Sequence, residues 1–384
     1  MKETKNVPQL RFSGFDDDWK EVIFSEIFTE RHDISTITKD YPQLSFTIAE
    51  GVIRPEDRKT NQRDFLIKDK ENKQYLKTEL NDIIYNPANV VFGAIHRNGL
   101  GNGVLSPIYK IFYTNEDSVF LEGIVRNPEF IRKIANQTEG TVTKLKTLKP
   151  ENFLQMRSFI SPYLQEQQKI GAFLSHVDSL IQANTKKLES LKAVKKSLLQ
   201  KCFPKAGQKV PEMRFAGFIG EWKEMKLGEV ITVNSGKDYK HLDEGNIPVY
   251  GTGGYMLSVN AKLSDIDAVG IGRKGTIDNP LYLKAPFWTV DTLFFMTTNN
   301  GFDLKFIYNL SQNIDWKSMD ESTSIPSLSK NNIVDVDVLI PATFEEQQKI
   351  GQFFSKYDSL ITAQQKEIDK LKDIKKSLLQ KMFV

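Results

Sequence analysis

The chain has 384 residues, 40% of them hydrophobic and 26% charged, with a formal net charge of +3. This length indicates two or three domains, and the composition excludes a disordered or fibrous chain. The weak positive charge neither requires nor excludes a nucleic acid partner. We expect neither secretion nor membrane insertion, because a signal peptide and any apolar run near roughly 18 residues are lacking. The one cysteine, Cys202, excludes an internal disulfide and fits a cytoplasmic location.

A segment near the N-terminus occurs twice. VPQLRFSGFDDDWKE (7–21) returns as VPEMRFAGFIGEWKE (210–224), with Val, Pro, Arg, Phe, Gly, Phe, Trp, Lys and Glu in register. The match indicates a tandem duplication. We interpret Trp19 and Trp222 as packing anchors, with contact to a partner protein as the alternative.

The segments between the repeated parts differ. Residues 25–150 and 228–335 show no comparable similarity, although both mix short β-branched runs with Gly-rich turns. Each predicts a compact mixed α/β domain. The framework is therefore copied, while the two middles have diverged.

A second repeated segment predicts two long helices. Residues 166–203, which begin EQQKIG and end KKSLLQKCF, match residues 346–383 at 24 of 38 positions. Apolar residues recur at spacings of three and four, which indicates one apolar seam on each helix. The predicted interface residues are Ile170, Phe173, Val177, Leu180, Leu191 and Leu198 in the first helix, and Ile350, Phe353, Tyr357, Leu360, Leu371 and Leu378 in the second.

Two polar residues interrupt this predicted seam. Asn184 and Gln364 fall at equivalent inner positions, where polar side chains fix the register of paired helices. The alternative is a local phase shift that brings Leu188 and Ile368 inside instead.

A helix of this length needs a partner along its side, because 38 residues span roughly 57 Å. The other copy is the obvious partner, and a two-fold relation would pack the helices antiparallel with the variable domains at opposite ends. Only residues 204–209 join the first helix to the second repeat. By pseudo-symmetry, Phe383 is expected near Val7.

Motifs of catalysis are lacking. The Gly-rich stretches 99–103 and 251–254 resemble phosphate loops, but neither opens an amphipathic helix after a strand, and 270–276 departs from G-x-x-x-x-G-K-[ST]. There is no Asn-Pro-Pro-aromatic motif of amino-methylating DNA enzymes. The four histidines lie far apart and Cys202 has no evident base. We therefore predict no catalytic or metal site.

The whole pattern resembles the specificity subunits of type I restriction-modification systems. The resemblance is carried by Pro8–Phe12 and Pro211–Phe215, by the Trp-Lys pairs at 19–20 and 222–223, and by the doubled EQQKIG with its later KKSLLQK. It implies two target-recognition domains, 1–160 and 206–340, and two conserved helical regions, 161–205 and 341–384. The implied fold is mixed α/β, with the helices packed as an antiparallel coiled coil.

This resemblance also implies a function. Such a subunit is not an enzyme; it binds double-stranded DNA at a bipartite, asymmetric site, one half to each domain. Its helical regions set the gap and bind two methyltransferase subunits, and through them the restriction and translocase subunits. S-adenosylmethionine, ATP and Mg²⁺ would be bound by those partners, and no cofactor by this chain.

Polar and Gly-rich stretches of both domains contain residues of the chemical types that bind DNA. Arg, Lys, Asn and Gln read base edges, while Lys, Ser and Thr hold phosphates. The first domain offers Arg54, Arg58, Lys59, Arg63, Arg97, Asn98 and Asn102; the second offers Lys237, Lys240, Tyr250, Arg273, Lys274 and Thr276. For each, an ordinary solvated turn is the alternative. Two rival functions are considered: an adaptor that binds proteins, and a nuclease or fused modification enzyme.

Overall fold

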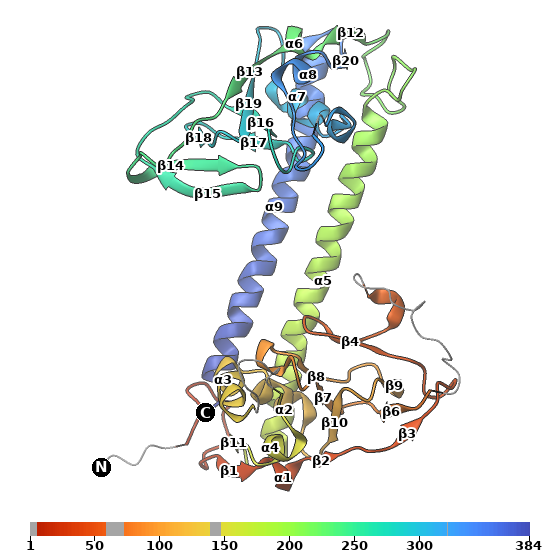
Figure 1. The fold of residues 1–384 in the computed structure, drawn as a ribbon, viewed down its shortest axis with the longest axis vertical. Coiled ribbons are helices and arrows are strands. Elements are labelled where there is room, and N and C mark those ends of the chain that lie inside the picture. Colours follow the sequence, from red (N-terminus) through yellow and green to blue (C-terminus); the bar gives the residue numbers. More distant parts are fainter. Residues whose placement is uncertain (1–5, 59–72, 139–146, 321) are drawn as a thin grey trace. The chain divides into compact units, whose positions relative to one another are not determined.

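The computed structural model describes residues 6–58, 73–138, 147–320 and 322–384. It contains two compact units, of which unit 1 comprises Met1–Asn184 with Glu367–Val384 and unit 2 comprises Thr185–Lys366. The long helices α5 (Leu164–Cys202) and α9 (Phe344–Lys381) each pass from one unit into the other (Figure 1). Each unit is therefore built from both repeats.

Unit 1 is a mixed α/β domain. Its strands form a four-stranded antiparallel sheet in the order β2-β10-β7-β8, a three-stranded sheet β3-β6-β9, and the pairs β1-β11 and β4-β5. The elements are β1 (Lys20–Ile23), α1 (Phe24–Ile27), β2 (Thr29–Glu30), β3 (Ile34–Ser35), β4 (Ser45–Thr47), β5 (Gly51–Ile53), η1 (Pro55–Asp57), β6 (Tyr75–Thr78), β7 (Ile83–Tyr85), η3 (Val90–Phe92), β8 (Ile95–Arg97), β9 (Gly103–Leu105), β10 (Lys110–Tyr113), α2 (Ser118–Val125), α3 (Pro128–Gln137), α4 (Pro150–Leu154) and β11 (Arg157–Ile160).

Unit 2 contains a four-stranded sheet β13-β19-β16-β17, a three-stranded sheet β15-β14-β18 and the pair β12-β20. Its elements are β12 (Lys223–Lys226), α6 (Leu227–Val230), β13 (Ile231–Ser235), β14 (Glu244–Gly251), β15 (Gly254–Val259), β16 (Ala268–Gly272), β17 (Leu281–Leu283), β18 (Trp288–Thr289), β19 (Leu293–Thr298), α7 (Leu304–Ser311), η4 (Trp316–Met319), α8 (Lys330–Val334) and β20 (Asp337–Ile340).

The two middles share a topology that their sequences do not reveal. In both four-stranded sheets, neighbouring strands are antiparallel, and the strand order relative to the chain is the same. A short helix follows each sheet, and its N-cap aspartate accepts a hydrogen bond of 2.8 Å from the backbone N–H three residues on. The mixed α/β fold predicted for each domain is confirmed. Outside the four-stranded sheet the domains differ, since β3-β6-β9 and β4-β5 in unit 1 are replaced by β15-β14-β18 in unit 2.

The arginine and glutamate that the two repeats share bind each other. Arg11 donates through Nε and Nη2 to both carboxylate oxygens of Glu166, at 2.6 and 2.9 Å. Arg214 and Glu346 repeat this in unit 2 at 2.7 and 2.8 Å. Both glutamates are buried, so this two-bond fork satisfies a charge that would otherwise be costly to bury. The forks fasten the start of each long helix to its domain.

The rest of the EQQKIG motif fixes the same junction. Gln167 and Gln347 each accept a hydrogen bond of 3.0 Å from the backbone N–H of the helix-capping residues Asp117 and Asp303. A β-carbon at Gly171 would stand 2.5 Å from the Asp117 carboxylate, so a larger residue would displace the side chain that caps α2. The repeated motif is thus a docking site for α2 and α7.

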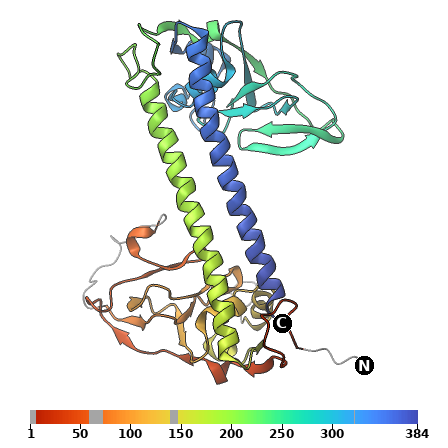
Figure 2. The same ribbon diagram turned by 180° about the vertical axis from the view of Figure 1, so that it is seen from behind.

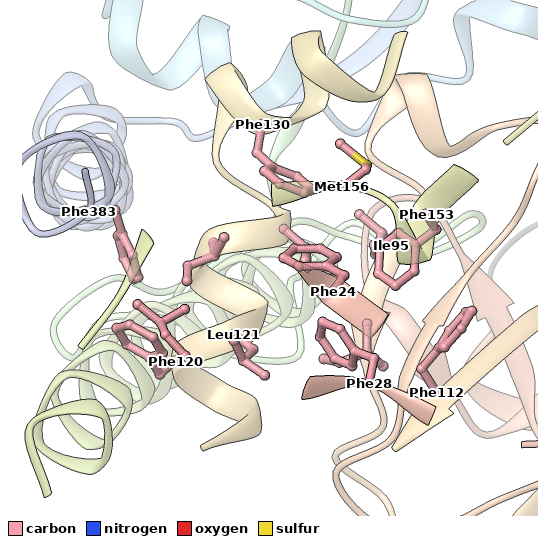
Figure 3. Close-up of a cluster of buried hydrophobic side chains, with 14 of the residues drawn as sticks. Phe24, Phe28, Ile95, Phe112, Phe120, Leu121, Phe130, Phe153, Met156 and Phe383 are labelled. Carbon is pink, nitrogen blue, oxygen red and sulfur yellow. The ribbon is translucent and has the colours of Figure 1, made fainter. Parts of the chain in front are cut away.

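The end of α9 completes the core of unit 1. The Phe383 ring lies 5.4 Å from that of Phe120 and 6.2 Å from that of Trp19, centroid to centroid, within the cluster of Figure 3. The backbone N–H of Leu10 donates to the carbonyl of Lys381 at 2.8 Å. The predicted return of the chain's last helix to the start of the first repeat is therefore confirmed.

The end of α5 occupies the equivalent place in unit 2. Phe203 packs 5.8 Å from Trp222 and 5.5 Å from Phe306, between ring centroids. The Met213 N–H donates to the Lys201 carbonyl at 2.9 Å, as its counterpart does in unit 1. Each long helix thus begins on one domain and ends inside the core of the other.

Within each unit, the two long helices pack together antiparallel. Asp178 and Lys375 form an ion pair of 2.5 Å in unit 1, and Lys195 and Asp358 form one of 2.6 Å in unit 2. In the repeat, Asp178 is equivalent to Asp358, and Lys195 is equivalent to Lys375. Moving along α5 therefore means moving back along α9, which confirms the predicted antiparallel pairing (Figure 2).

The seam itself differs from the predicted one at three positions. Phe173, Leu180 and Leu360 are 38%, 40% and 54% exposed, and so lie beside the seam. The neighbouring Leu174 and Phe354 are buried instead, because both phases carry apolar residues and packing against the domain selects one. The other predicted positions hold: Ile170, Val177 and Ile350 are buried, and Leu191, Leu198, Phe353, Tyr357, Leu371 and Leu378 are half-buried.

The two alternatives for the polar positions are not exclusive. Gln364 is buried, and so are Leu188 and Ile368, because residues four apart share one helix face. Asn184 is half-buried and donates to the Leu180 carbonyl at 2.8 Å.

None of the helices in the described ranges has the length and hydropathy needed to cross a membrane.

We predict that Phe383→Ala destabilises unit 1 alone, by about 3 kcal/mol, because it empties a buried site at the end of α9. Hydrogen exchange should then accelerate about a hundredfold in β1 and β11, with β12 and β20 unchanged. Phe203→Ala is the matched control and should reverse the pattern. Equal acceleration in both units for either variant would contradict the separate cores.

Candidate nucleic-acid interface

The predicted residues of the second domain come from three stretches, 235–240, 250–255 and 271–276, which converge on one turn of unit 2. Backbone N–H groups of Lys237 and Arg273 donate to the carbonyls of Thr289 and Thr292 at 2.9 and 2.8 Å. The third stretch is tied to the same turn, since Val290 donates to the Tyr250 carbonyl at 3.0 Å. The turn between β18 and β19 therefore gathers segments distant in sequence. Nothing in its own sequence marked this role.

Two glycines make the convergence possible. A β-carbon at Gly236 would stand 1.9 Å from the carbonyl oxygen of Val290, and one at Gly272 would stand 2.0 Å from that of Thr276. At either position, the β-carbon of any larger residue would therefore collide with a backbone carbonyl. These glycines therefore allow the loops to pack closely around this surface, and Gly272 belongs to the stretch 270–276 that was compared with a phosphate loop.

A hollow of about 630 Å³ opens between these segments. It is lined by Asp238, Tyr239, Lys240, Gly251, Thr252, Gly253, Gly254, Tyr255, Met256, Val290, Asp291 and Thr292. Lys240 is exposed, and Tyr255 is 64% exposed at the tip of the β14–β15 hairpin. The lining offers donors, acceptors and an aromatic face, which is the mixture that base edges require.

The predicted residues of the second domain take different places around this hollow. Lys240 lines it, and Tyr250 lies behind it, with its ring 6.4 Å from that of Tyr255 and a pKa raised by burial. Lys237, Arg273, Lys274 and Thr276 are exposed on the adjoining loops. Thr252 and Tyr255 fall within the predicted stretch 250–255, whereas sequence reasoning missed Met256 and Thr292 as members of the hollow.

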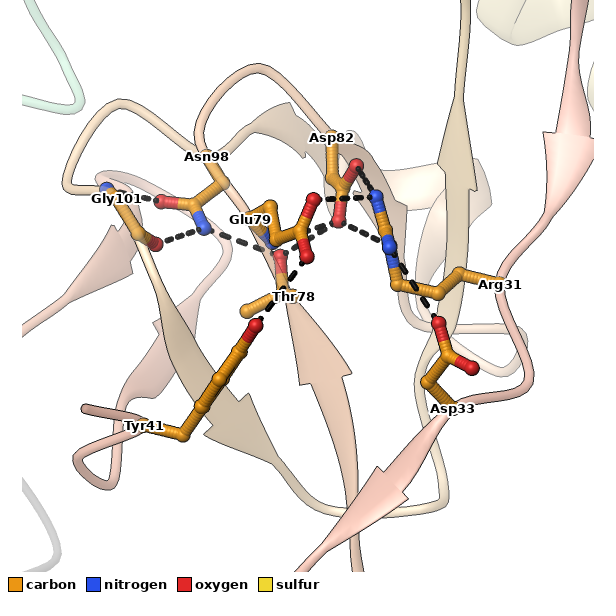
Figure 4. A network of polar contacts seen from close by, with 8 residues as sticks. All are labelled: Arg31, Asp33, Tyr41, Thr78, Glu79, Asp82, Asn98 and Gly101. Atoms are coloured by element: carbon orange, nitrogen blue, oxygen red, sulfur yellow. Dashed lines mark hydrogen bonds and ion pairs between the residues drawn. The ribbon is translucent and has the colours of Figure 1, made fainter. Parts of the chain in front are cut away.

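The first domain is different, because one predicted residue is withdrawn from the surface. Asn98 is fully buried, and its amide donates to Thr78 Oγ1 at 3.0 Å and to the Gly101 carbonyl at 2.7 Å. Its side-chain oxygen accepts from the N–H group of Gly101, as Figure 4 shows, and also from that of Leu100. The prediction that Asn98 contacts DNA is corrected on this ground: all its hydrogen-bonding positions are used to shape the loop.

A buried ion pair supports the same loop. Arg31 donates to Asp82 through Nε at 2.9 Å and Nη2 at 3.1 Å, and Asp82 also accepts from Thr78 Oγ1 at 3.2 Å. Burial raises the pKa of Asp82, while the hydrogen bond from Arg31 opposes this rise. Thr78 Oγ1 in turn accepts from Asn98, so the hydrogen-bond network in Figure 4 connects Arg31 to the loop. Asn102, farther along this loop, stays exposed.

The remaining candidates of the first domain lie around strands β5 and β8. Arg54 is exposed and Arg58 is half-buried beyond β5, whereas Lys59 and Arg63 lie outside the described residues. Arg97 ends β8, with Nη1 2.9 Å from Asn81 Oδ1 and Nε 3.5 Å from Glu122. Its charge is therefore partly neutralised. Strands β5 and β8 are in contact, so these candidates lie in one part of unit 1.

Neighbouring titratable groups offer no sign of acid–base chemistry at this site. Burial, with Arg126 nearby, lowers the pKa of His96 to about 4, and its Nε2 lies 2.9 Å from the Ile48 carbonyl. The ring is therefore neutral at physiological pH. Within the described parts of the chain, no group of three or more His, Cys, Asp and Glu side chains has metal-binding geometry.

Comparisons with known proteins agree with this architecture. A family model described as the type I restriction modification DNA specificity domain matches residues 219–373. A Mycoplasma genitalium protein assigned as a type I specificity subunit is 24% identical over 228 residues, 57% of this chain and 59% of that protein. The specificity subunit of the type I restriction enzyme MjaVIII from Methanocaldococcus jannaschii is 29% identical over 115 residues, 29% of this chain and 24% of that one.

Fold similarity extends further than these sequence matches, which span 59% and 24% of the two relatives. The crystal structure of a type I restriction-modification S subunit from M. genitalium matches with a TM-score of 0.66 at 18% identity. The match covers 98% of this chain and 99% of that one. The two chains therefore share one fold along nearly their whole length.

We predict that Asn98→Ala destabilises unit 1 in the absence of DNA by about 2 to 3 kcal/mol, because it leaves buried groups of the loop without partners. Thermal unfolding and exchange of the Leu100 and Gly101 amides measure this effect. Asn102→Ala is the control, because Asn102 is exposed in the same loop, and it should change stability by less than about 0.5 kcal/mol. Equal stability of the two variants would disprove the structural role of Asn98.

Proposed function

Because the chain belongs to the family of type I restriction-modification specificity subunits, we propose that it is the DNA-recognition subunit of such a complex. One observation carries the proposal: a duplicated framework holds two domains that share a four-stranded sheet of one topology but differ in their other strands and loops. Such a scaffold suits a bipartite, asymmetric DNA site, with one half read by each domain.

The reading surface proposed for the second domain is the hollow around Lys240 and Tyr255. Exposed Lys237 and Arg273 are tied by backbone hydrogen bonds to the turn that borders it, and Lys274 follows Arg273. Cations beside a hydrogen-bonding surface suit a duplex, whose phosphates flank its base edges. For the first domain we propose the loop that carries Asn102, together with Arg54 and Arg58. The loops differ, so the half-sites should differ.

Partner binding is proposed for an apolar patch that occurs once in each unit. Its members are exposed or half-exposed residues at equivalent repeat positions: Leu10, Phe173, Leu180 and Ile374 in unit 1, and Met213, Phe353, Leu360 and Val194 in unit 2. Phe173 and Phe353 directly precede the buried Leu174 and Phe354, so they lie at the edge of the seam. Met213 and Phe353 line a mainly apolar pocket of about 220 Å³.

Two equivalent patches suit two equivalent partners. We therefore propose that each binds one methyltransferase subunit, through which the restriction and translocase subunits join. In this proposal S-adenosylmethionine, ATP and Mg²⁺ are bound by those subunits, and the present chain is not itself an enzyme. Its proposed contribution is to position the partners on a chosen sequence.

We predict that selection of bound sequences from random duplexes, with the chain and its methyltransferase partner, yields two unlike half-sites at a fixed separation. Affinity should fall steeply with salt, because phosphate contacts release counterions. Lys240→Ala should change preference in one half-site only, and Asn102→Ala in the other. An absence of any enriched motif would favour a protein-binding adaptor, and identical half-sites would contradict two distinct reading surfaces.

The long helices should also set the gap between the half-sites. Inserting one heptad after Lys186 and another after the equivalent Lys366 keeps the seam and adds about 10.5 Å of helix. We predict that the selected gap grows by about 3 base pairs, at about 3.4 Å each. An insertion in one helix alone breaks the pairing and should abolish binding. An unchanged gap in the double insertion would exclude the helices as the spacer.

A further inference from the structure

A second hollow in unit 2 has a different chemical character from the first. It encloses about 520 Å³ and is lined by Ser235, Arg273, Lys274, Phe294, Ser327, Leu328, Ser329 and Lys330. Three of these side chains are cationic, three carry hydroxyl groups, and none is acidic. We name this group the cationic cleft.

An aromatic ring holds two of the cations. The guanidinium carbon of Arg273 lies 5.8 Å from the centroid of the Phe294 ring, and Nζ of Lys330 lies 5.9 Å from it. The ring is 4% exposed, so it is a wall of the cleft rather than a stacking surface. Attraction to the ring face keeps both cations at the cleft without neutralising them.

These cations also lack the acidic partners that other lysines of the unit have. Lys226 and Lys317 each lie 2.6 Å from an aspartate oxygen. Among the described residues, no carboxylate forms an ion pair with Arg273, Lys274 or Lys330, and the hydrogen bond of the Arg273 guanidinium goes to a backbone carbonyl, that of Asp291, at 3.4 Å. The positive charge of the cleft is therefore available to an anion.

Backbone hydrogen bonds hold the walls of the cleft in place. The Leu328 N–H donates to the carbonyl of Arg273 at 2.9 Å, and the Gly275 N–H donates to that of Pro326 at 2.8 Å. Lys274 and Ser327 form an isolated antiparallel bridge. The loop after β16 and the segment before α8 thus form one preorganised site, which lowers the cost of ordering side chains on binding.

We propose that the cationic cleft holds a phosphate of the DNA backbone and so sets the position of the duplex on the neighbouring reading hollow. The Arg273 N–H donates to Thr292, which lines that hollow, so the two hollows share one turn. Arginine, lysine and serine are the side chains that commonly hold DNA phosphates, and such contacts position without reading sequence. Lys330 and Ser329 lie outside every stretch that the sequence singled out. This inference rests on the proposed function.

The test measures how the affinity of the complex with its methyltransferase partner depends on KCl, for the selected duplex and for one with scrambled half-sites. Lys330→Gln should weaken both by a similar factor, about five- to tenfold, and reduce the slope of log affinity against log salt by about 0.9. Arg273→Gln should act likewise. Lys226→Gln removes the same charge away from the cleft and should leave the slope unchanged, while Lys330→Arg should preserve it.

Each outcome has a distinct meaning. An unchanged slope in Lys330→Gln, with sequence preference and salt dependence intact in the unaltered protein, would overturn the phosphate site alone. A loss of affinity restricted to the selected duplex would make Lys330 a base reader and overturn it too. If the unaltered protein shows neither sequence preference nor salt dependence, the proposed function itself fails.

Discussion

The structure depends on an exchange of helix ends between the two repeats. Phe383 completes the core beside Trp19, and Phe203 completes the core beside Trp222, so neither domain is whole without the other copy. At its other end, each helix is fastened by a buried Arg–Glu fork. The seam between the helices is therefore fixed at both ends by packing and by charge. This constraint explains why the shared sequence is concentrated at the junctions.

A fixed framework allows the domains to differ where they meet solvent. Both contain a four-stranded sheet of one topology and a capped helix docked on the EQQKIG motif. In unit 2, loops packed around Gly236 and Gly272 form a polar hollow beside a cationic cleft. In unit 1, a buried network around Asn98 and Asp82 shapes a loop instead. One scaffold thus carries two unlike surfaces, which is the property that a split and asymmetric target requires.

The repeat, the two long helices and their antiparallel pairing were predictable, because identity at fixed offsets and apolar spacing are properties of the sequence itself. The common sheet of the two middles was not, because backbone hydrogen bonds set strand order and many side chains satisfy them. The choice of Leu174 over Phe173 was undetermined, since both are apolar and only packing distinguishes them. Asn98 was predicted to contact DNA because an asparagine side chain suits both base contacts and loop hydrogen bonds. Its burial depends on tertiary contacts, which the sequence does not reveal. Convergence of the three stretches of the second domain depends on the turn between β18 and β19, whose sequence carries no motif.

The central claim is that this chain selects the DNA sequence on which its partners act. Single-molecule methylation sequencing tests it most directly, in cells that make the chain with its methyltransferase partner and in cells that make the partner alone. The account predicts a methylated motif of two unlike halves with a fixed gap, present only when the chain is made. Methylation that is unchanged by the chain, with expression of the partner verified, would contradict it.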